Sequence, residues 1–216
     1  EKPKAIPIVL LYDDEHLNMT TEFTYYVGTR RACHGDGETA QRRKRQMKEN
    51  EVVWENEWED IPCPCKAFND KCKPLGTLRC LLVDSPTVGG CYQFRTTSWN
   101  SISGCLNSQG LIKAATAGIL RGIPLQLRLI NRQVATPTGN VAMPIVHVEF
   151  AGNLQSLYEH TRAIAEQRRA MLQDVAQLEA QARLMLAAGT TAMTPEEDAA
   201  IAAEFYPEAP ELPEDP

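Results

Sequence analysis

Four of the chain's seven cysteines constrain its fold more than any other feature. Cys33, Cys63, Cys65 and Cys72 fall within one polar, turn-rich segment with few apolar residues of its own to bury. Ordering each residue of such a segment costs about 1–2 kcal/mol of conformational entropy, so burial alone cannot hold it. Four thiolates are a complete ligand set for one tetrahedral ion, and a structural Zn²⁺ contributes on the order of 10 kcal/mol. We therefore expect these cysteines to bind zinc in an insertion at residues 30–75.

The spacing of the cysteines is also compatible with arrangements other than a four-thiolate zinc site. A standard finger has two Cys-x-x-Cys pairs, whereas here Cys33 is followed by a long insertion, a Cys-Pro-Cys sequence and Cys72. His34 can replace a sulfur ligand, most readily Cys33. The thiols can also be reduced and unrelated, or form a disulfide, which requires an oxidising compartment. No export signal is visible, so we expect reduced thiols in the cytoplasm of a host bacterial cell.

The sequence Gly35-Asp36-Gly37 after the first cysteine fits a metal-binding turn. Glycine tolerates the positive φ angles that point backbone amides at a thiolate. Asp36 and Glu38 are alternatively ligands for a hard metal or a catalytic carboxylate pair, although no second cluster of carboxylates or histidines supports either role.

Charged residues are segregated along the chain. Eight acidic residues beyond position 195 outweigh a remainder of net charge +2, which gives the total of −6. An acidic run at positions 49–60 follows a basic block near the cysteines, whose members are Arg30, Arg31, Arg42, Arg43, Lys44, Arg45 and Lys48. Such a block is typical of a surface that contacts nucleic-acid phosphates. The alternative is a solvated helix face neutralised by the neighbouring acidic run.

Hydrophobic periodicity predicts an α+β domain over residues 1–152. We expect strands at 5–12, 19–28, 76–84, 91–96, 123–131 and 143–150, a helix at 39–48, and a second helix from Ser98. Trp54 and Trp58 are expected to pack the insertion onto this domain. The order favours a mostly antiparallel sheet with a packed helix against one face. A sheet with one helix-free face is also a platform for RNA or single-stranded DNA.

The segment Phe94–Ile102 is a second candidate site. Arg95 and Asn100 bring polar donors to a strand end and a helix start, where free amides favour a phosphate. The alternative is that Thr97 or Ser98 caps the helix while Trp99 packs in the core.

No catalytic constellation can be assembled from the sequence, so we expect a protein that is not an enzyme. The four histidines, His16, His34, His147 and His160, stand in unrelated contexts. The remaining cysteines, Cys80, Cys91 and Cys105, lie at apolar positions and are expected in the core.

Residues 153–188 are expected to form one long helix. Leu157, Ile164, Met171 and Leu178 repeat every seven residues, which is typical of a helix that packs on another helix. They are the predicted partner-binding residues, either in a homo-oligomer or on another protein, as a short coiled coil or docked on their own domain. Residues 189–216 are expected to form a short helix, begun by Thr194-Pro195 with Glu197 in a capping box, and an acidic disordered tail.

Several elements together resemble a known family. They are Cys33-x-Gly-Asp-Gly-Glu-Thr-Ala, Cys-Lys-Pro-x-Gly-x-Leu from Cys72, and the segment Phe94–Ile102. The chain resembles, over about residues 5–150, phage and prophage proteins of the recombination directionality factor-like family, whose members are also described as hydrolase or metal-binding protein. The family takes its name from a factor that binds a large serine integrase and switches it from integration to excision.

Two functions follow as expectations. The resemblance implies a non-enzymatic, zinc-binding accessory protein that acts on a serine integrase–DNA complex to control excision. The basic block and the sheet instead favour a protein that binds single-stranded DNA or RNA, with copies assembled along the strand. Neither function requires a membrane, and no run of about twenty apolar residues is present.

Overall fold

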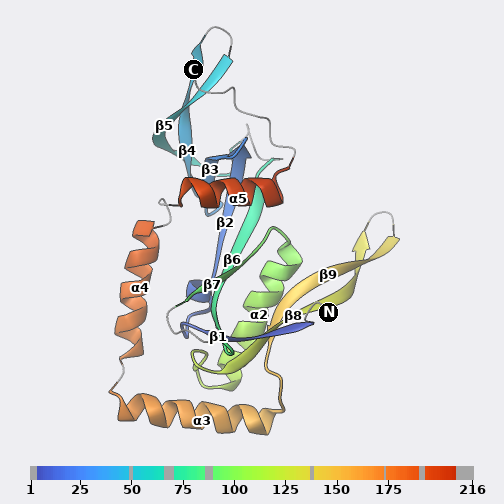
Figure 1. The fold of residues 1–216 in the computed structure, drawn as a ribbon, viewed down its shortest axis with the longest axis vertical. Coiled ribbons are helices and arrows are strands. Elements are labelled where there is room, and N and C mark those ends of the chain that lie inside the picture. Colours follow the sequence, from blue (N-terminus) through green and yellow to red (C-terminus); the bar gives the residue numbers. More distant parts are fainter. Residues whose placement is uncertain are drawn as a thin grey trace. The chain divides into compact units, whose positions relative to one another are not determined.

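The computed structural model describes residues 4–48, 51–65, 71–85, 90–136, 139–172, 174–189 and 193–207 (Figure 1). The chain divides into two compact units. Unit 1 comprises Glu1–Thr20 and Gly76–Met185, and unit 2 comprises Thr21–Leu75 and Leu186–Pro216. Strands β2 (Met19–Val27) and β6 (Lys73–Leu82) contribute residues to both. The predicted α+β class with a mostly antiparallel sheet is confirmed.

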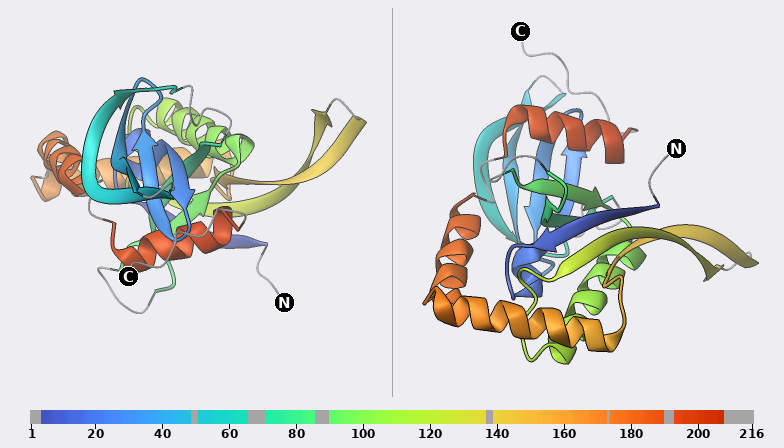
Figure 2. Two further views of the ribbon diagram at one scale, coloured as in Figure 1. Left: turned by 90° about the horizontal axis from the view of Figure 1, so that it is seen from above. Right: turned by 60° about the horizontal axis from the view of Figure 1, so that its bottom comes forward.

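The sheet of unit 1 follows the order β6, β1, β8, β9, with β7 paired to β6. Its further strands are β1 (Ala5–Leu10), β7 (Tyr92–Thr96), β8 (Pro124–Thr136) and β9 (Gly139–Glu149). The strands predicted in this part of the chain are all present. Strands β8 and β9 run further than predicted, because their antiparallel pairing continues to Thr136↔Gly139 and makes a two-stranded ribbon (Figure 2).

Helix α2 (Trp99–Ala115) packs on this sheet. It begins as predicted, since the Ser98 side chain caps it by accepting a hydrogen bond from the Ser101 amide. Ile102 and Cys105 are fully buried against the strands, whereas Trp99 is 53% exposed. The prediction that Trp99 packs in the core is therefore wrong. A tryptophan in the first turn of α2 lies outside the buried stripe of this helix.

The predicted single helix over 154–188 is also wrong, because two helices, α3 (Leu154–Ala170) and α4 (Val175–Gly189), stand in its place. Leu172, between them, adopts a left-handed backbone with φ of 51°. Arg168 occupies a polar position of the heptad repeat. It pairs at 2.6 Å with Asp13, which also belongs to unit 1. The polar break in the apolar seam therefore marks a helix that docks on its own domain.

Helix α4 is held on unit 1 by the turn that precedes the short helix α1 (Glu15–Asn18). The Glu179 carboxylate accepts hydrogen bonds from the amides of Asp13 and Asp14, at 2.7 and 3.0 Å. Arg183 of α4 pairs with the Asp14 carboxylate. These contacts explain why residues 153–185 do not extend as a rod.

Unit 2 carries the strand order β2, β3, β4, β5, which adds β3 (Arg30–Gly35), β4 (Thr39–Lys48) and β5 (Glu51–Pro62). The helix predicted over 39–48 is wrong, because these residues form β4. The physical reason is cross-strand pairing: β4 faces the acidic run of β5, with Arg42 opposite Glu59. A helix would place these partners far apart, whereas neighbouring strands bring them into direct contact.

Helix α5 (Pro195–Phe205) belongs to unit 2 and starts with the predicted capping box. The Glu197 amide donates to the Thr194 hydroxyl at 3.2 Å, and the Glu197 carboxylate accepts from the Thr194 amide at 3.1 Å. The predicted tail at 208–216 lies outside the described residues. Among the described helices, none has the length and apolarity needed to cross a membrane.

Candidate functional site

The four predicted metal-ligating cysteines line one pocket of unit 2. Cys33 comes from β3, Cys63 and Cys65 follow the end of β5, and Cys72 directly precedes β6. The pocket has a volume of about 270 Å³, and its other walls are apolar side chains and glycines: Phe23, Gly35, Gly37, Ala40, Ile61 and Pro64. The fold thus brings thiols that are far apart in the sequence to one place.

The turn after β3 is built around the pocket. Gly37 has a φ of +105°, a left-handed conformation that favours glycine. The backbone amides of Gly37 and Cys65 donate hydrogen bonds to the Cys63 sulfur. Asp36 closes the turn, since its carboxylate accepts from the amides of Glu38 and Thr39, both at 2.8 Å. Asp36 is thereby used in the turn, as expected of a loop that points amides at a thiolate.

The thiols of the pocket influence one another electrostatically. Burial raises the pKa of the Cys33 thiol to about 12, and the nearby sulfurs of Cys72, Cys65 and Cys63 add to the rise. Burial likewise raises the pKa of Cys72 to about 11, again with contributions from Cys65 and Cys63. Without a counter-charge these thiols are therefore neutral at pH 7.

The pocket meets the chemical requirements of a Cys₄ zinc site in the type and number of its donors. Within the described residues, however, no three Cys, His, Asp or Glu side chains are grouped closely enough to hold an ion as placed. A bound ion would therefore have to draw the sulfur atoms inward.

His34 does not line the thiol pocket. Its ring packs edge-on against Trp58, with 5.1 Å between the ring centroids, and its Nδ1 lies 3.5 Å from Glu22. Successive residues of a strand point to opposite faces, so a pocket that receives Cys33 excludes its neighbour. The alternative in which His34 replaces Cys33 as a ligand does not fit this arrangement.

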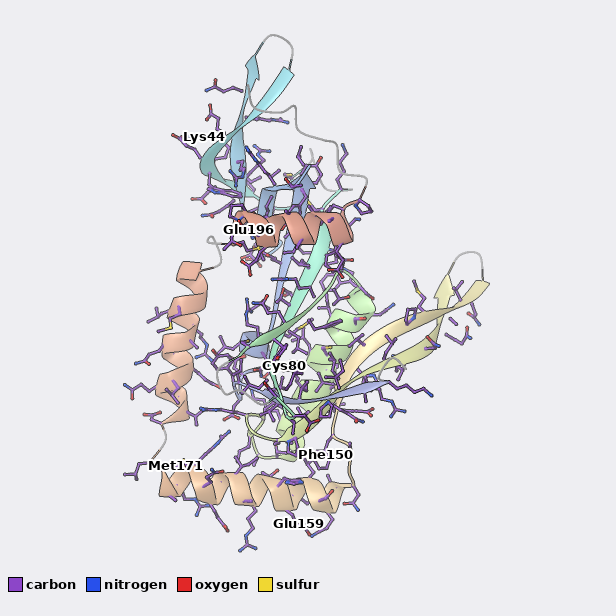
Figure 3. All side chains as sticks on the ribbon, viewed as in Figure 1. Lys44, Cys80, Phe150, Glu159, Met171 and Glu196 are labelled. Carbon is purple, nitrogen blue, oxygen red and sulfur yellow. The ribbon has the colours of Figure 1, made fainter. Side chains whose placement is uncertain are left out.

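The predicted basic block is distributed over two strands and faces acidic partners. Arg42 pairs with Glu59 at 2.8 Å and Lys44 with Glu57 at 2.7 Å; Figure 3 labels Lys44 on the β4–β5 hairpin. Arg43 stacks over the Trp58 ring at 4.8 Å. Arg30 and Arg45 are exposed, while the Lys48 side chain lies outside the described residues, as does that of Trp54.

Arg31 has a different environment from the rest of the basic block. Its side chain is only 2% exposed and lies 3.6 Å from Glu22 and 3.7 Å from Asp198 of α5. Tyr26 also donates a hydrogen bond to Asp198. Glu22, Tyr26 and Asp198 were not predicted from the sequence to have a role. The sequence feature that could have indicated this site is Asp198, an aspartate on the apolar stripe of α5, three residues before Ile201 and four before Ala202.

The second predicted site, at the start of α2, is partly occupied by the chain itself. The Thr96 hydroxyl accepts a hydrogen bond from the Ser98 amide, and Ser98 caps the helix. Arg95 donates to the Gln93 side chain at 2.7 Å, and Asn100 is exposed.

The remaining cysteines lie outside the thiol pocket. Cys80, labelled in Figure 3, and Cys105 are buried in the core of unit 1, as predicted. Cys91 is exposed, contrary to prediction, because it lies before the first residue of β7 rather than inside the strand.

The predicted partner-binding residues divide into two pairs. Leu157 is buried, and Ile164 packs against the same core of unit 1. Met171 and Leu178 are 57% and 43% exposed, and Figure 3 labels Met171 just beyond the end of α3. Helix α4 adds two further exposed apolar side chains, Leu184 and Met185. The exposed members of the predicted set therefore lie on α4 and at the bend before it.

Comparison with known proteins gives one match. A family model described as recombination directionality factor-like matches residues 1–151, which include all four pocket cysteines and end before α3. No curated protein and no solved structure matches the chain. The family has a role in phage DNA recombination. Because the match covers more than half of the 216 residues, the chain belongs to the recombination directionality factor-like family.

Proposed function

We propose that this protein is a non-enzymatic accessory factor that acts on a serine integrase–DNA complex of a phage or prophage and controls excision. The family match over residues 1–151 is the observation that carries the proposal. Helix α4, which lies beyond the matched residues, adds exposed apolar side chains to this domain. Such residues suit a protein partner, because large exposed apolar patches mark interaction sites.

The integrase contact is assigned to α4. Leu178, Leu184 and Met185 are 43%, 72% and 74% exposed, whereas Ala182 and Glu179 face unit 1. A helix held by polar contacts on one side and apolar on the other can pack against a helix of another protein. Leu157 and Ile164 are used in the core and are not part of this surface.

The integrase role is tested by recombination assays with large serine integrases of phages and prophages. The wild-type protein should bind the integrase and shift it from integration to excision. The triple variant Leu178→Glu, Leu184→Glu, Met185→Glu should weaken binding at least 10-fold. A matched triple variant on the exposed surface of α3, Ala163→Glu, Gln167→Glu and Ala170→Glu, adds the same charge away from α4 and should bind normally. Normal excision with the triple variant would remove α4 from the interface.

The same experiment separates the integrase role from direct nucleic-acid binding. An integrase factor binds weakly to free DNA and RNA, whereas a nucleic-acid-binding protein shows strong affinity that falls steeply with salt. The pairing of Arg42 and Lys44 with carboxylates favours the first result. Tight, salt-sensitive binding to free strands together with no effect on the integrase would overturn the proposed function.

We also propose that the four pocket thiols hold a structural Zn²⁺. The support is that Cys33, Cys63, Cys65 and Cys72 line one pocket. A bound ion would neutralise the thiolates and join β3, the segment after β5 and the start of β6. Its chemistry would be structural, because four protein ligands leave no open position for substrate.

Elemental analysis of protein purified without chelator should find one zinc per chain. Substitution with Co²⁺ should give the absorption of a tetrahedral thiolate site. Cys72→Ser should lose the metal, and Cys91→Ser, which changes an exposed cysteine outside the pocket, should retain it. Absence of stoichiometric metal in the wild-type protein would end the zinc proposal and leave the integrase role to its own test.

A further inference from the structure

Helix α5 lies across β2 and β3 of unit 2 (Figure 1). The helix uses one stripe for this contact, in which Ile201, Ala202 and Tyr206 are buried at 1%, 3% and 7% exposure. They pack with Tyr26 and Leu75, which are 0% and 1% exposed. The stripe follows the spacing of one helix face, so the sheet receives α5 as an amphipathic helix.

Polar contacts fix the position of α5 on this face. The Tyr26 hydroxyl donates to the Asp198 carboxylate at 3.0 Å, and the Arg31 guanidinium lies 3.7 Å from the same oxygen. At the other end, the Tyr206 hydroxyl donates to the Thr24 carbonyl at 2.8 Å. An aspartate at one end and a tyrosine at the other therefore define the register of the helix.

The contact is also complementary in charge. Helix α5 carries Glu196, Glu197, Asp198 and Glu204 and no basic residue. The receiving face contributes Arg31, which also lies 3.6 Å from Glu22, and Lys73, which donates to the Phe205 carbonyl at 2.7 Å and lies 4.8 Å above the Tyr206 ring. These two cations favour an acidic helix over a basic one at this face.

Only one side of the contact between α5 and the strands of unit 2 lies in the part of the chain that the family model matches. The receiving residues, from Thr24 to Leu75, lie within the matched stretch 1–151, whereas α5 lies beyond it. An 11-residue helix is also too short to be stable alone in water. Helix α5 is therefore an added segment whose order depends on docking.

We propose that this face of unit 2 is a docking site for an acidic amphipathic helix of a protein partner, and that α5 is its intramolecular occupant. The partner helix carries a carboxylate at the position of Asp198, an aliphatic and a small residue at those of Ile201 and Ala202, and a tyrosine at that of Tyr206. Helix α5 competes from within the same chain at an effective concentration of about millimolar. The proposed docking site does not depend on the integrase role.

The test uses the full chain with a protease site inserted between Gly189 and Met193, cut after purification. A fluorescent peptide of residues 193–207 is then added as the probe. The cut protein should exchange its own α5 for the peptide, with saturable binding at least 10-fold tighter than that of the uncut chain. The uncut chain binds weakly because α5 occupies the site.

Peptide variants keep the protein itself unchanged. Asp198→Lys should reduce peptide binding at least 10-fold, because it places a cation beside Arg31. Glu204→Lys alters charge equally at an exposed position and should change affinity less than threefold. If both peptide variants lose affinity equally, binding depends on overall charge alone, and the proposal is overturned.

Two further outcomes would also overturn it. If the cut α5 never exchanges, the helix is a fixed part of unit 2. If intact chains exchange α5 with each other and form dimers, the occupant is a second copy instead of another protein. Size-exclusion chromatography of mixed labelled and unlabelled chains distinguishes these outcomes.

Discussion

Unit 1 and unit 2 are stabilised by different means. In unit 1, α2 and the strands share one large apolar cluster, with Ile8, Leu78, Ile102 and Leu120 fully buried. Unit 2 has two small clusters: one adjoins the thiol pocket, and the other is completed by α5. Apolar burial is non-directional and tolerant of exchange between similar residues, whereas thiols and ion pairs work only with specific partners.

The difference shows where each unit is sensitive. Unit 1 should lose stability mainly in proportion to the apolar volume removed from its core, with smaller losses at the ion pairs that hold α3 and α4. Unit 2 should respond strongly to a few changes in chemistry, at the cysteines and at the contacts of α5. Four experiments, ordered by decreasing size of the expected effect, test this difference.

Removal of the proposed zinc should have the largest effect and should be confined to unit 2. A structural zinc contributes on the order of 10 kcal/mol, so a chelator should greatly speed amide exchange in β3 and β4 and leave β1 and β8 protected. Hydrogen–deuterium exchange with peptide resolution measures both units at once. Equal responses in the two units, or none, would contradict the contrast.

Truncation of a core side chain should have the next largest effect, now in unit 1. Ile102 is 0% exposed between α2 and the sheet, so Ile102→Ala should lower the free energy of unfolding by about 4 kcal/mol. Leu111→Ala, in the same helix at 74% exposure, is the matched control and should have little effect. Urea denaturation measures both, and similar losses would contradict a core centred on Ile102.

The elements that were predicted correctly from the sequence are those that depend on local patterns. The strands of unit 1 were predictable because alternation is local, and the α2 cap and α5 capping box were predictable because each depends on a few adjacent residues. Strand β4 was not, since its basic residues suit a helix and only the cross-strand partners on β5 decide otherwise.

Non-local contacts also explain what was missed in the sites. The bend after Ala170 has a local and a non-local source: the Asp174 carboxylate caps the first turn of α4 by accepting a hydrogen bond from the Gln177 amide, and Arg168 before the bend pairs with Asp13. The shared pocket of four cysteines was predictable because the cluster is unusual in composition. The burial of Arg31 beside Asp198 was not, because it depends on a helix from the other end of the chain.

Loss of the Arg168–Asp13 ion pair should lower the free energy of unfolding by an intermediate amount, and this amount should depend on pH. Burial by itself would raise the pKa of Asp13, but hydrogen bonds from Arg168 and from the amides of Leu120 and Arg121 outweigh it and hold the pKa below 3.8. A lowered folded pKa means that the pair stabilises the fold above pH 3.8 and that this contribution is lost as pH falls further.

Arg168→Ala should therefore cost about 2 kcal/mol at pH 7, because it leaves a half-buried carboxylate without its cation. The loss should shrink as the pH falls below 3.8. Arg162→Ala, at an exposed position of the same helix, should be neutral at either pH. A loss for Arg168→Ala that does not vary with pH would contradict the ion pair as its cause.

The smallest effect is expected at the start of α5. The Thr194 hydroxyl accepts from the Glu197 amide, and loss of such a cap costs about 1 kcal/mol. Thr194→Ala should therefore speed amide exchange in α5 about fivefold, while Thr194→Ser, which keeps the hydroxyl, should not. Exchange in unit 1 should be unchanged, because the buried α5 residues of the described part of the chain pack with residues of unit 2. If Thr194→Ala also speeds amide exchange in the strands of unit 1, the two units unfold together. They would then differ in composition but would not have separate stabilities.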